Sequence, residues 1–430
     1  MKIVSILFSL LSLCLFALPV FSQQPVPERP RILVSTDIGG TDPDDNQSMA
    51  HLLMYCNEFD LEGLVSSPSY GTGNKEEIIR MIGLYEKQFP ALSKHASGWA
   101  SPDYLRSITK QGRKGAAPME GYSTATEGSD WIVTCARKQS ERPLYILVWG
   151  GLDDVAQALH DAPDIAHNIR IYWIGGPNKK WSVNSYVYIV SHFPDLWFIE
   201  NNGTYRGFIY NSKNKDKYNM GYYATYVKDA GLMGADFGNY YKGNPKLGDT
   251  PSLLYMMDGD PADPTRESWG GSFEPFTRSA RVVFQGTTTA LDTVPVYSIM
   301  EFHIDGPVMN DMAVGTPCIT LDIANQQWDG YYLGDGHYVV KYSTYKTGTQ
   351  PYTITSKTVP GFISRQGEIT VDNLWPGKPN ATDYLLGSHW YTDKQASDLF
   401  WADCQGALTV YKWRNAVMED WGKRWGWLKK

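Results

Sequence analysis

The stretch Arg31–Tyr55, RILVSTDIGGTDPDDNQSMAHLLMY, decides the fold. Its apolar run, Ile32–Val34, leads into a turn that contains two glycines and several aspartates. Beyond the turn, apolar side chains recur at helical spacing at Met49, Leu52, Leu53 and Cys56. The pattern therefore predicts a strand, an acidic loop and a helix.

The acidic loop concentrates negative charge, because four carboxylates, Asp37, Asp42, Asp44 and Asp45, lie close together in the chain. Such groups repel one another unless a cation lies between them or they point apart into water. A hard divalent cation that takes oxygen ligands, calcium first, would answer that need. The alternative is a solvated loop in which Asp44 or Asp45 caps the helix. Spacing alone leaves both interpretations open.

The N-terminus predicts export. Residues 1–22 carry a lysine near the start, a long apolar stretch and a small residue before Gln23, which is the pattern of a secretory signal peptide. We therefore expect a secreted or periplasmic protein. The polar, proline-rich segment 23–31 argues against a membrane anchor, and we expect no membrane span after signal cleavage.

Composition narrows the class of partner. The formal net charge of −7 argues against a nucleic-acid partner. The aromatic content of 13% favours stacking surfaces, which in an exported protein suggests a carbohydrate substrate. The sequence leaves the oligomeric state open, and also whether Cys318 and Cys404 form a disulfide.

The first two thirds of the chain predict an α/β fold. Apolar runs at 61–66, 144–148, 169–174 and 196–199 alternate with amphipathic helical segments. This alternation is typical of a mostly parallel sheet flanked by helices. Ligands bind such sheets beyond the carboxyl ends of the strands, and that is where Asp37, Trp149, Gly175 and Asn178 are expected.

The character of the chain changes at about residue 285. Short β-rich runs separated by turn residues predict an antiparallel, sandwich-like domain of roughly seven strands over 285–404. A helical segment at 410–425 follows, so we interpret this all-β domain as inserted into the α/β domain (23–284 and 405–430). Its aromatics predict either a glycan platform or core and edge packing: Trp328, Tyr331, Tyr332, Tyr345, Trp375, Trp390 and Tyr391.

Four turns carry a resemblance to a known family. In order they are Asp37–Asp45, Val148–Leu152, Ile174–Gly176 and Gly248–Ser252. They resemble the metal- and sugar-binding turns of inosine-uridine-type nucleoside hydrolases. More closely, the chain is similar to exported nucleoside-hydrolase-like proteins often labelled cellulose-binding. That similarity covers about residues 30–280 and 405–425, and rests also on Tyr205–Gly207, Ser268–Gly271 and Tyr411–Arg414.

The resemblance implies a role for each matching residue. Asp37 matches a metal ligand that also acts as general base on the attacking water. Asp45 matches the bidentate metal ligand, and Asp44 the carboxylate that touches a sugar hydroxyl. The backbone carbonyl of Trp149 and the carboxylate of Asp249 match the remaining ligands of a Ca²⁺ ion.

Two departures from the family bear on the substrate. The loop between Asp37 and Asp44 is longer by three residues, Gly40, Thr41 and Asp42. Family members that protonate a purine often carry histidine where this chain has Gly248. We therefore favour a calcium-dependent glycosidase acting on an O-glycosidic bond, with a furanosyl bond as one form of it. The alternatives are a non-catalytic carbohydrate-binding protein and a nucleoside N-ribohydrolase.

Further polar and aromatic residues are candidates for contacts with the sugar. Asn74, Asn178 and Asn184 lie in expected turns, where capping and turn formation are the alternative roles. Glu200 ends an expected strand and is a better candidate for an acid than Glu267. Trp269, in a glycine-rich loop, predicts either stacking on a sugar or a core contact.

Overall fold

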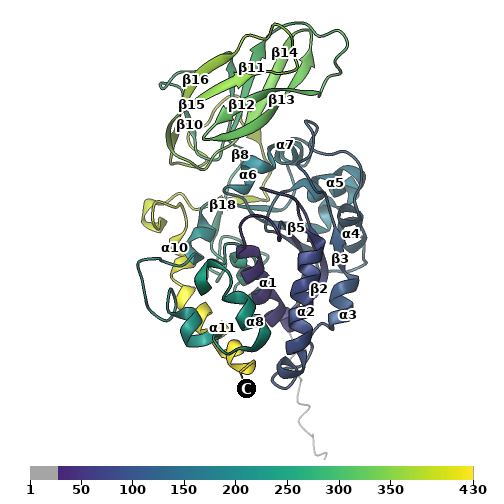
Figure 1. Cartoon of the computed structure of the whole chain (residues 1–430), viewed down its shortest axis with the longest axis vertical. Helices are drawn as coiled ribbons and strands as arrows, with labels where there is room; N and C mark the ends of the chain where they lie inside the picture. The colour runs from purple at the N-terminus through teal and green to yellow at the C-terminus, as the bar shows by residue number, and fades with distance from the viewer. Residues whose placement is uncertain (1–27, 430) are drawn as a thin grey trace, which may run out of the picture.

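Two β-sheets organise the chain, which is described here by a computed structural model (Figure 1). The structure describes residues 28–429, so the expected signal peptide at 1–22 lies outside the described residues. Within that range, no helix combines the length and apolar character that crossing a bilayer requires.

The first sheet has eight strands in the order β3-β2-β1-β4-β5-β6-β18-β7. All neighbouring pairs are parallel except β18 with β7. The strands are β1 (Arg31–Thr36), β2 (Asp60–Ser66), β3 (Thr109–Gln111), β4 (Leu144–Val148), β5 (Ile169–Ile174), β6 (Phe198–Asn201), β18 (Trp390–Asp393) and β7 (Phe273–Pro275). The mostly parallel α/β sheet expected from the sequence is confirmed.

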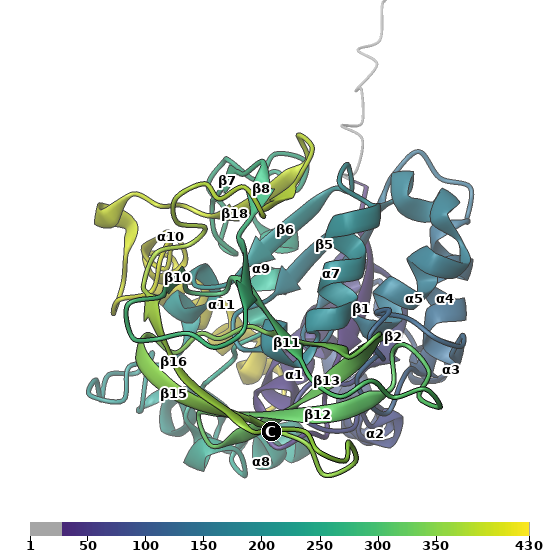
Figure 2. The same cartoon turned by 90° about the horizontal axis from the view of Figure 1, so that it is seen from above.

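Helices cover both faces of this sheet (Figure 2). Successive residues of a strand face opposite sides, so each buried strand contributes apolar side chains to a core on either face. In β1, Leu33 belongs to one core cluster, whereas Ile32 and Val34 belong to the other. The helices are α1 (Asp44–Tyr55), α2 (Lys75–Leu92), α3 (Pro102–Ser107), α4 (Glu127–Ala136), α5 (Asp153–Asp161), α6 (Asn178–Trp181), α7 (Val183–His192), α8 (Gly231–Phe237), α9 (Thr250–Met257), α10 (Leu408–Tyr411) and α11 (Arg414–Trp427).

The second sheet also has eight strands, in the order β10-β16-β15-β12-β13-β14-β11-β9. These strands are β9 (Arg281–Gln285), β10 (Thr293–Pro295), β11 (Ile299–Asp305), β12 (Pro317–Ile323), β13 (Gln326–Gly334), β14 (His337–Tyr342), β15 (Gly348–Thr355) and β16 (Arg365–Asp372). We predicted a sandwich, whereas these strands form one continuous, barrel-like sheet. β13 pairs with both β12 and β14, and so joins the strands β10-β16-β15-β12 to the strands β14-β11-β9.

The barrel-like domain leaves and rejoins the first sheet at one edge. β7 precedes it, β18 follows it, and these two strands pair with each other. The expected domain range of 285–404 therefore includes β18, a strand of the first sheet. The ring of Trp390 in β18 is fully buried and stacks on Phe198 in β6, with 4.4 Å between ring centroids.

Most aromatics considered for a glycan platform are core residues. Trp375 and Trp390 are fully buried, and Tyr331 and Tyr332 are buried as well. Tyr345, by contrast, is 44% exposed. A further two-stranded ladder, β8 (Arg278–Ser279) with β17 (Tyr384–Leu385), lies where the two domains join.

Candidate metal centre

The turns beyond the carboxyl ends of the parallel strands surround a cavity of about 480 Å³. Asp37 follows β1, Ser69 follows β2 and Asn178 follows β5, so three strands of the first sheet each contribute a polar side chain just beyond their carboxyl ends. The barrel-like domain closes one side through Gln326 and Tyr345. The other lining residues are Gly40, Thr41, Asp42, Tyr70, Pro177, Lys180, Trp181, Tyr241 and Lys246.

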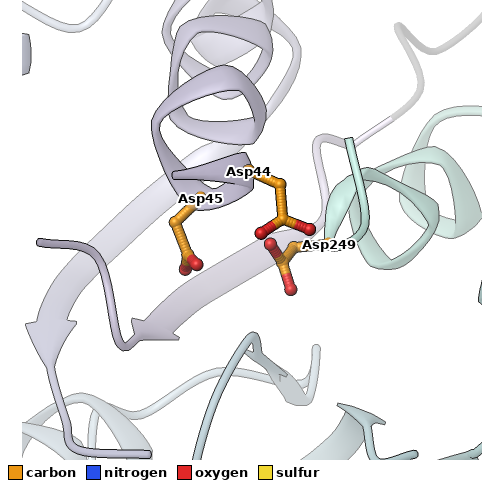
Figure 3. Close-up of side chains that lie close together, drawn as sticks. All are labelled: Asp44, Asp45 and Asp249. Carbon is orange, nitrogen blue, oxygen red and sulfur yellow. The ribbon is translucent and has the colours of Figure 1, made fainter. Parts of the chain in front are cut away.

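Three carboxylates next to this cavity form the acidic cluster Asp44, Asp45 and Asp249. Each offers one oxygen, and these oxygens all lie within 4.8 Å of one another (Figure 3). Asp44 and Asp45 belong to the first turn of α1, and Asp249 immediately precedes α9. The positive ends of two helix dipoles therefore help to hold the negative charge.

Burial makes the cluster costly unless a cation is present. Burial and the neighbouring carboxylates raise the pKa of Asp45 and Asp249 well above the usual range. Burial also raises the pKa of Asp44 to about 7. The second carboxylate oxygen of Asp249, Oδ2, is buried and has no hydrogen-bond partner within residues 28–429. An unpartnered carboxylate oxygen in an all-oxygen donor set fits a hard divalent cation.

The nearest ammonium does not replace such a cation. Lys246 forms ion pairs with Asp42 and, at 3.4 Å, with Asp44. Burial would lower the pKa of Lys246, but these carboxylates outweigh it and raise that pKa. In the described part of the chain, Lys246 forms no ion pair with Asp45 or Asp249. One ammonium at the edge therefore leaves most of the negative charge unbalanced.

Asp37 lies beside the acidic cluster and lines the cavity. Burial raises its pKa to about 6, although hydrogen bonds with Asp45 and Ser69 oppose the shift. The turn after β4 packs against it: a Cβ on Gly150 would come within 2.9 Å of the Asp37 Cβ. Asp37 is not part of the group of three oxygens within 4.8 Å. Its position suits a base facing the cavity, and a contact with the metal stays a prediction.

Trp149, the residue before Gly150, fixes the turn after β4 relative to α9. Its buried indole Nε1 donates a hydrogen bond to Ser252 Oγ at 2.6 Å. The Ser252 hydroxyl in turn donates to the backbone carbonyl of Asp249 at 2.8 Å. The two turns assigned to the metal are thus tied together, and the role of the Trp149 carbonyl as a ligand stays a prediction.

Of the other sugar-binding candidates, Asn178 lines the main cavity. Its side-chain oxygen accepts a hydrogen bond from Ser69 Oγ at 2.8 Å, and its amide donates to Ile174 O at 3.0 Å. Asn184 lines a smaller neighbouring cavity and donates to the Tyr331 hydroxyl at 2.9 Å. Both residues therefore face space in which a ligand fits.

The remaining candidates are placed elsewhere. Asn74 caps α2 by accepting a hydrogen bond from the backbone N–H of Glu76 at 3.1 Å. Glu200 is fully buried and paired with the ammonium of Lys179 at 2.6 Å. Trp269 packs against the apolar core. None of the three lines the main cavity.

Several cavity residues do not stand out as site residues in the sequence. Lys246 stands three positions before Asp249, and that opposite charge was the available signal. Trp181 stands three positions after Asn178, in the same short helix. Gln326 and Tyr345 carried no such signal, because only the packing of the two domains brings them to the cavity.

The glycine before Asp249 has a steric reason. A Cβ on Gly248 would collide with the Asp44 carboxylate, so any side chain at this position, including histidine, requires that carboxylate to move. We expect Gly248→Ala to displace Asp44 and lower calcium affinity at least tenfold in calorimetric titration. Gly83→Ala is the matched control, because a Cβ there meets nothing within 4 Å. Unchanged affinity in Gly248→Ala would show that Asp44 is not a ligand.

Comparison with known protein families identifies the fold. Residues 31–273, more than half of the chain, match the family described as "Cellulose-binding Sde182, nucleoside hydrolase-like domain". The chain belongs to this family. The resemblance inferred from the turns is thereby confirmed.

One solved structure supports the same fold. A nucleoside hydrolase-related hypothetical protein from Saccharophagus degradans, described as associated with carbohydrate metabolism, matches with a TM-score of 0.50 and 20% identity. The match covers 80% of this chain and 100% of that one. An inosine-uridine preferring nucleoside hydrolase from Bacillus anthracis matches with a TM-score of 0.38 and 14% identity, over 59% and 86% of the two chains. No curated protein matches.

Proposed function

We propose that this protein is an exported, calcium-dependent glycosidase that hydrolyses an O-glycosidic bond, furanosyl in our preferred version, in a glycan-derived substrate. The observation that carries the proposal is the acidic cluster, in which Asp249 Oδ2 has no hydrogen-bond partner among residues 28–429, together with the cavity that Asp37 lines at the carboxyl ends of the strands. The family description and the expected signal peptide support an extracellular carbohydrate as the substrate.

The site residues divide the chemistry between them. A bound calcium ion would orient sugar hydroxyls and make water more acidic. Asp37, which faces the cavity, takes the proton from the attacking water. The anomeric carbon becomes positively charged as the leaving group departs, and the surrounding carboxylates stabilise that charge.

An O-glycosidic bond is favoured over a nucleoside by the contents of the cavity. Gly248 stands where a histidine would have to displace the Asp44 carboxylate, and no residue lining the described cavity is a histidine. Without a histidine at this site, a purine ring has no imidazolium to protonate it as it departs. The lining ammonium and hydroxyl groups of Lys180, Lys246 and Tyr241 are hydrogen-bond donors for sugar oxygens.

A carbohydrate-binding protein without catalysis is the second candidate. The observation that favours it is Lys246, whose ion pairs with Asp42 and Asp44 partly neutralise the acidic loop without a metal. The family description, which names cellulose binding, is compatible with it. A nucleoside N-ribohydrolase is the third, and it rests on the fold.

The test is a substrate panel measured with calcium and with a chelator. We expect calcium-dependent release of sugar from aryl arabinofuranosides and glycan fragments, faster than release of base from inosine or uridine. Faster release of base would overturn the choice of bond. Saturable oligosaccharide binding without turnover of any substrate would favour the non-catalytic protein.

A further inference from the structure

A second cavity continues the main one along the seam between the two domains. It has a volume of about 220 Å³ and includes Asn184 and Tyr331 in its lining. Ser69, Lys180 and Trp181 line both cavities. The space beside Asp37 therefore extends, past Trp181, to a compartment with walls from both domains. A ligand that fills both compartments is longer than one sugar ring.

Aromatic rings run along this seam. The ring centroids of Tyr70 and Trp181 are 4.5 Å apart, and those of Trp181 and Trp328 are 4.4 Å apart. Tyr70 is 52% exposed and Tyr345 is 44% exposed, although both line the main cavity. Exposed aromatic faces at a cavity offer apolar contact to the C–H face of a sugar.

Lys180 supplies the polar group among these rings. Its Nζ lies 4.6 Å from the Trp181 ring centroid and 5.3 Å from that of Tyr345. The same atom donates a hydrogen bond to Gln326 Oε1 of the barrel-like domain at 2.8 Å. Among residues 28–429, Lys180 has no carboxylate partner, and burial lowers its pKa to about 8. Its remaining N–H groups are available to a ligand.

We propose that this seam is a carbohydrate subsite for the sugar ring on the leaving-group side of the bond that is cleaved. Trp181, which is half-buried between Tyr70 and Trp328, packs against that ring, and Lys180 donates a hydrogen bond to one of its oxygens. This inference rests on the proposed function for which side of the cleaved bond lies in the seam. The binding of a sugar ring there rests on the seam itself. It assigns the barrel-like domain the role of selecting an oligosaccharide over a monosaccharide glycoside.

Binding, measured apart from turnover, tests the subsite. Calorimetric titration of the full chain with calcium would use cellotetraose, xylotetraose, arabinotriose and, as non-glycan rings, inosine and uridine. We expect Trp181→Ala to lower affinity for the preferred oligosaccharide about tenfold, which is about 1.4 kcal/mol. Trp181→Phe should retain most of the affinity, and Lys180→Met should lose part of it.

The matched control is Trp427→Ala. Trp427 lies near the C-terminal end of the chain, is half-buried and stacks on His95. The control variant should bind like the wild type, and thermal unfolding should verify that every variant is folded. Equal affinity of Trp181→Ala and wild type, binding of none of the oligosaccharides, or tighter binding of a nucleoside would overturn the subsite.

Turnover separates this inference from the proposed function. For the wild type, kcat/KM should be higher for the oligosaccharide than for an aryl monosaccharide glycoside, and Trp181→Ala should reduce that ratio. Trp181-dependent binding without turnover would retain the subsite and overturn the glycosidase. If the protein turns over substrate but Trp181→Ala leaves the ratio of the two kcat/KM values unchanged, the glycosidase would be retained and the subsite overturned.

Discussion

An Asp37→Asn variant is expected to lose about 10²–10⁴-fold in kcat on the glycoside that the wild type cleaves best. Asparagine has nearly the shape of aspartate but cannot accept the proton of the attacking water. Because Asp37 is not in the group of three oxygens within 4.8 Å, and asparagine keeps an oxygen that can contact a cation, calcium affinity should change much less than kcat. Steady-state kinetics and calorimetric calcium titration measure the two quantities.

A matched control for this variant lies at the opposite end of the sheet. Asp60 begins β2 and pairs with Arg142 at 2.8 Å, so Asp60→Asn also removes one carboxylate charge but leaves the cavity intact. Its kcat should equal that of the wild type. A kcat of Asp37→Asn within a factor of a few of the wild type would remove Asp37 from the role of base.

Calcium is expected to stabilise the folded protein through Asp249. At a calcium concentration a hundred times Kd, binding to the native state adds about 2.7 kcal/mol to the free energy of unfolding. Asp249→Asn should abolish this gain, because it removes the charge of a ligand whose Oδ2 has no other partner within the described chain. Thermal unfolding with calcium and with EGTA measures the gain.

The control, Asp258→Asn, changes an exposed aspartate beyond the other end of α9. It should keep the full response to calcium. A stability of the wild type that is independent of calcium would mean that the acidic cluster binds no metal.

The calcium-free protein should also show a distinctive dependence on pH. Folding raises the pKa of Asp37 from 3.8 to about 6 and that of Asp44 from 3.8 to about 7. Between these values the native state binds more protons than the unfolded state, so the contribution of these groups to stability falls as pH rises from about 4 to about 7. Calcium should suppress that loss, which the difference between unfolding curves with calcium and with EGTA isolates.

The elements that depend on local pattern were predictable from the sequence. The apolar run and acidic loop at 31–45 gave a strand, a turn and a helix start, and the structure has β1, the turn and α1 there. Turns at the carboxyl ends of parallel strands must meet at one edge of the sheet, so the proximity of Asp37, Gly150 and Asn178 followed from topology.

Features that depend on distant partners were not predictable. β13 contains Asp329 and Gly330, which interrupt the apolar alternation, and only pairing with β12 and β14 makes it a strand. Glu200 has the position of a functional carboxylate at a strand end, but the buried Lys179 neutralises it. Trp181 and Tyr345 reach one cavity because two domains pack together, and sequence spacing carries no record of that packing.

The neighbouring strands β7 and β18 have an evolutionary consequence. The barrel-like domain begins after β7 and ends before β18, and these two strands are paired. Its strands and loops can therefore diverge without altering the strand order of the first sheet. Relatives can therefore retain the acidic cluster while the side of the cavity formed by Gln326 and Tyr345 of the barrel-like domain changes. A shared fold in this family does not require a shared ligand.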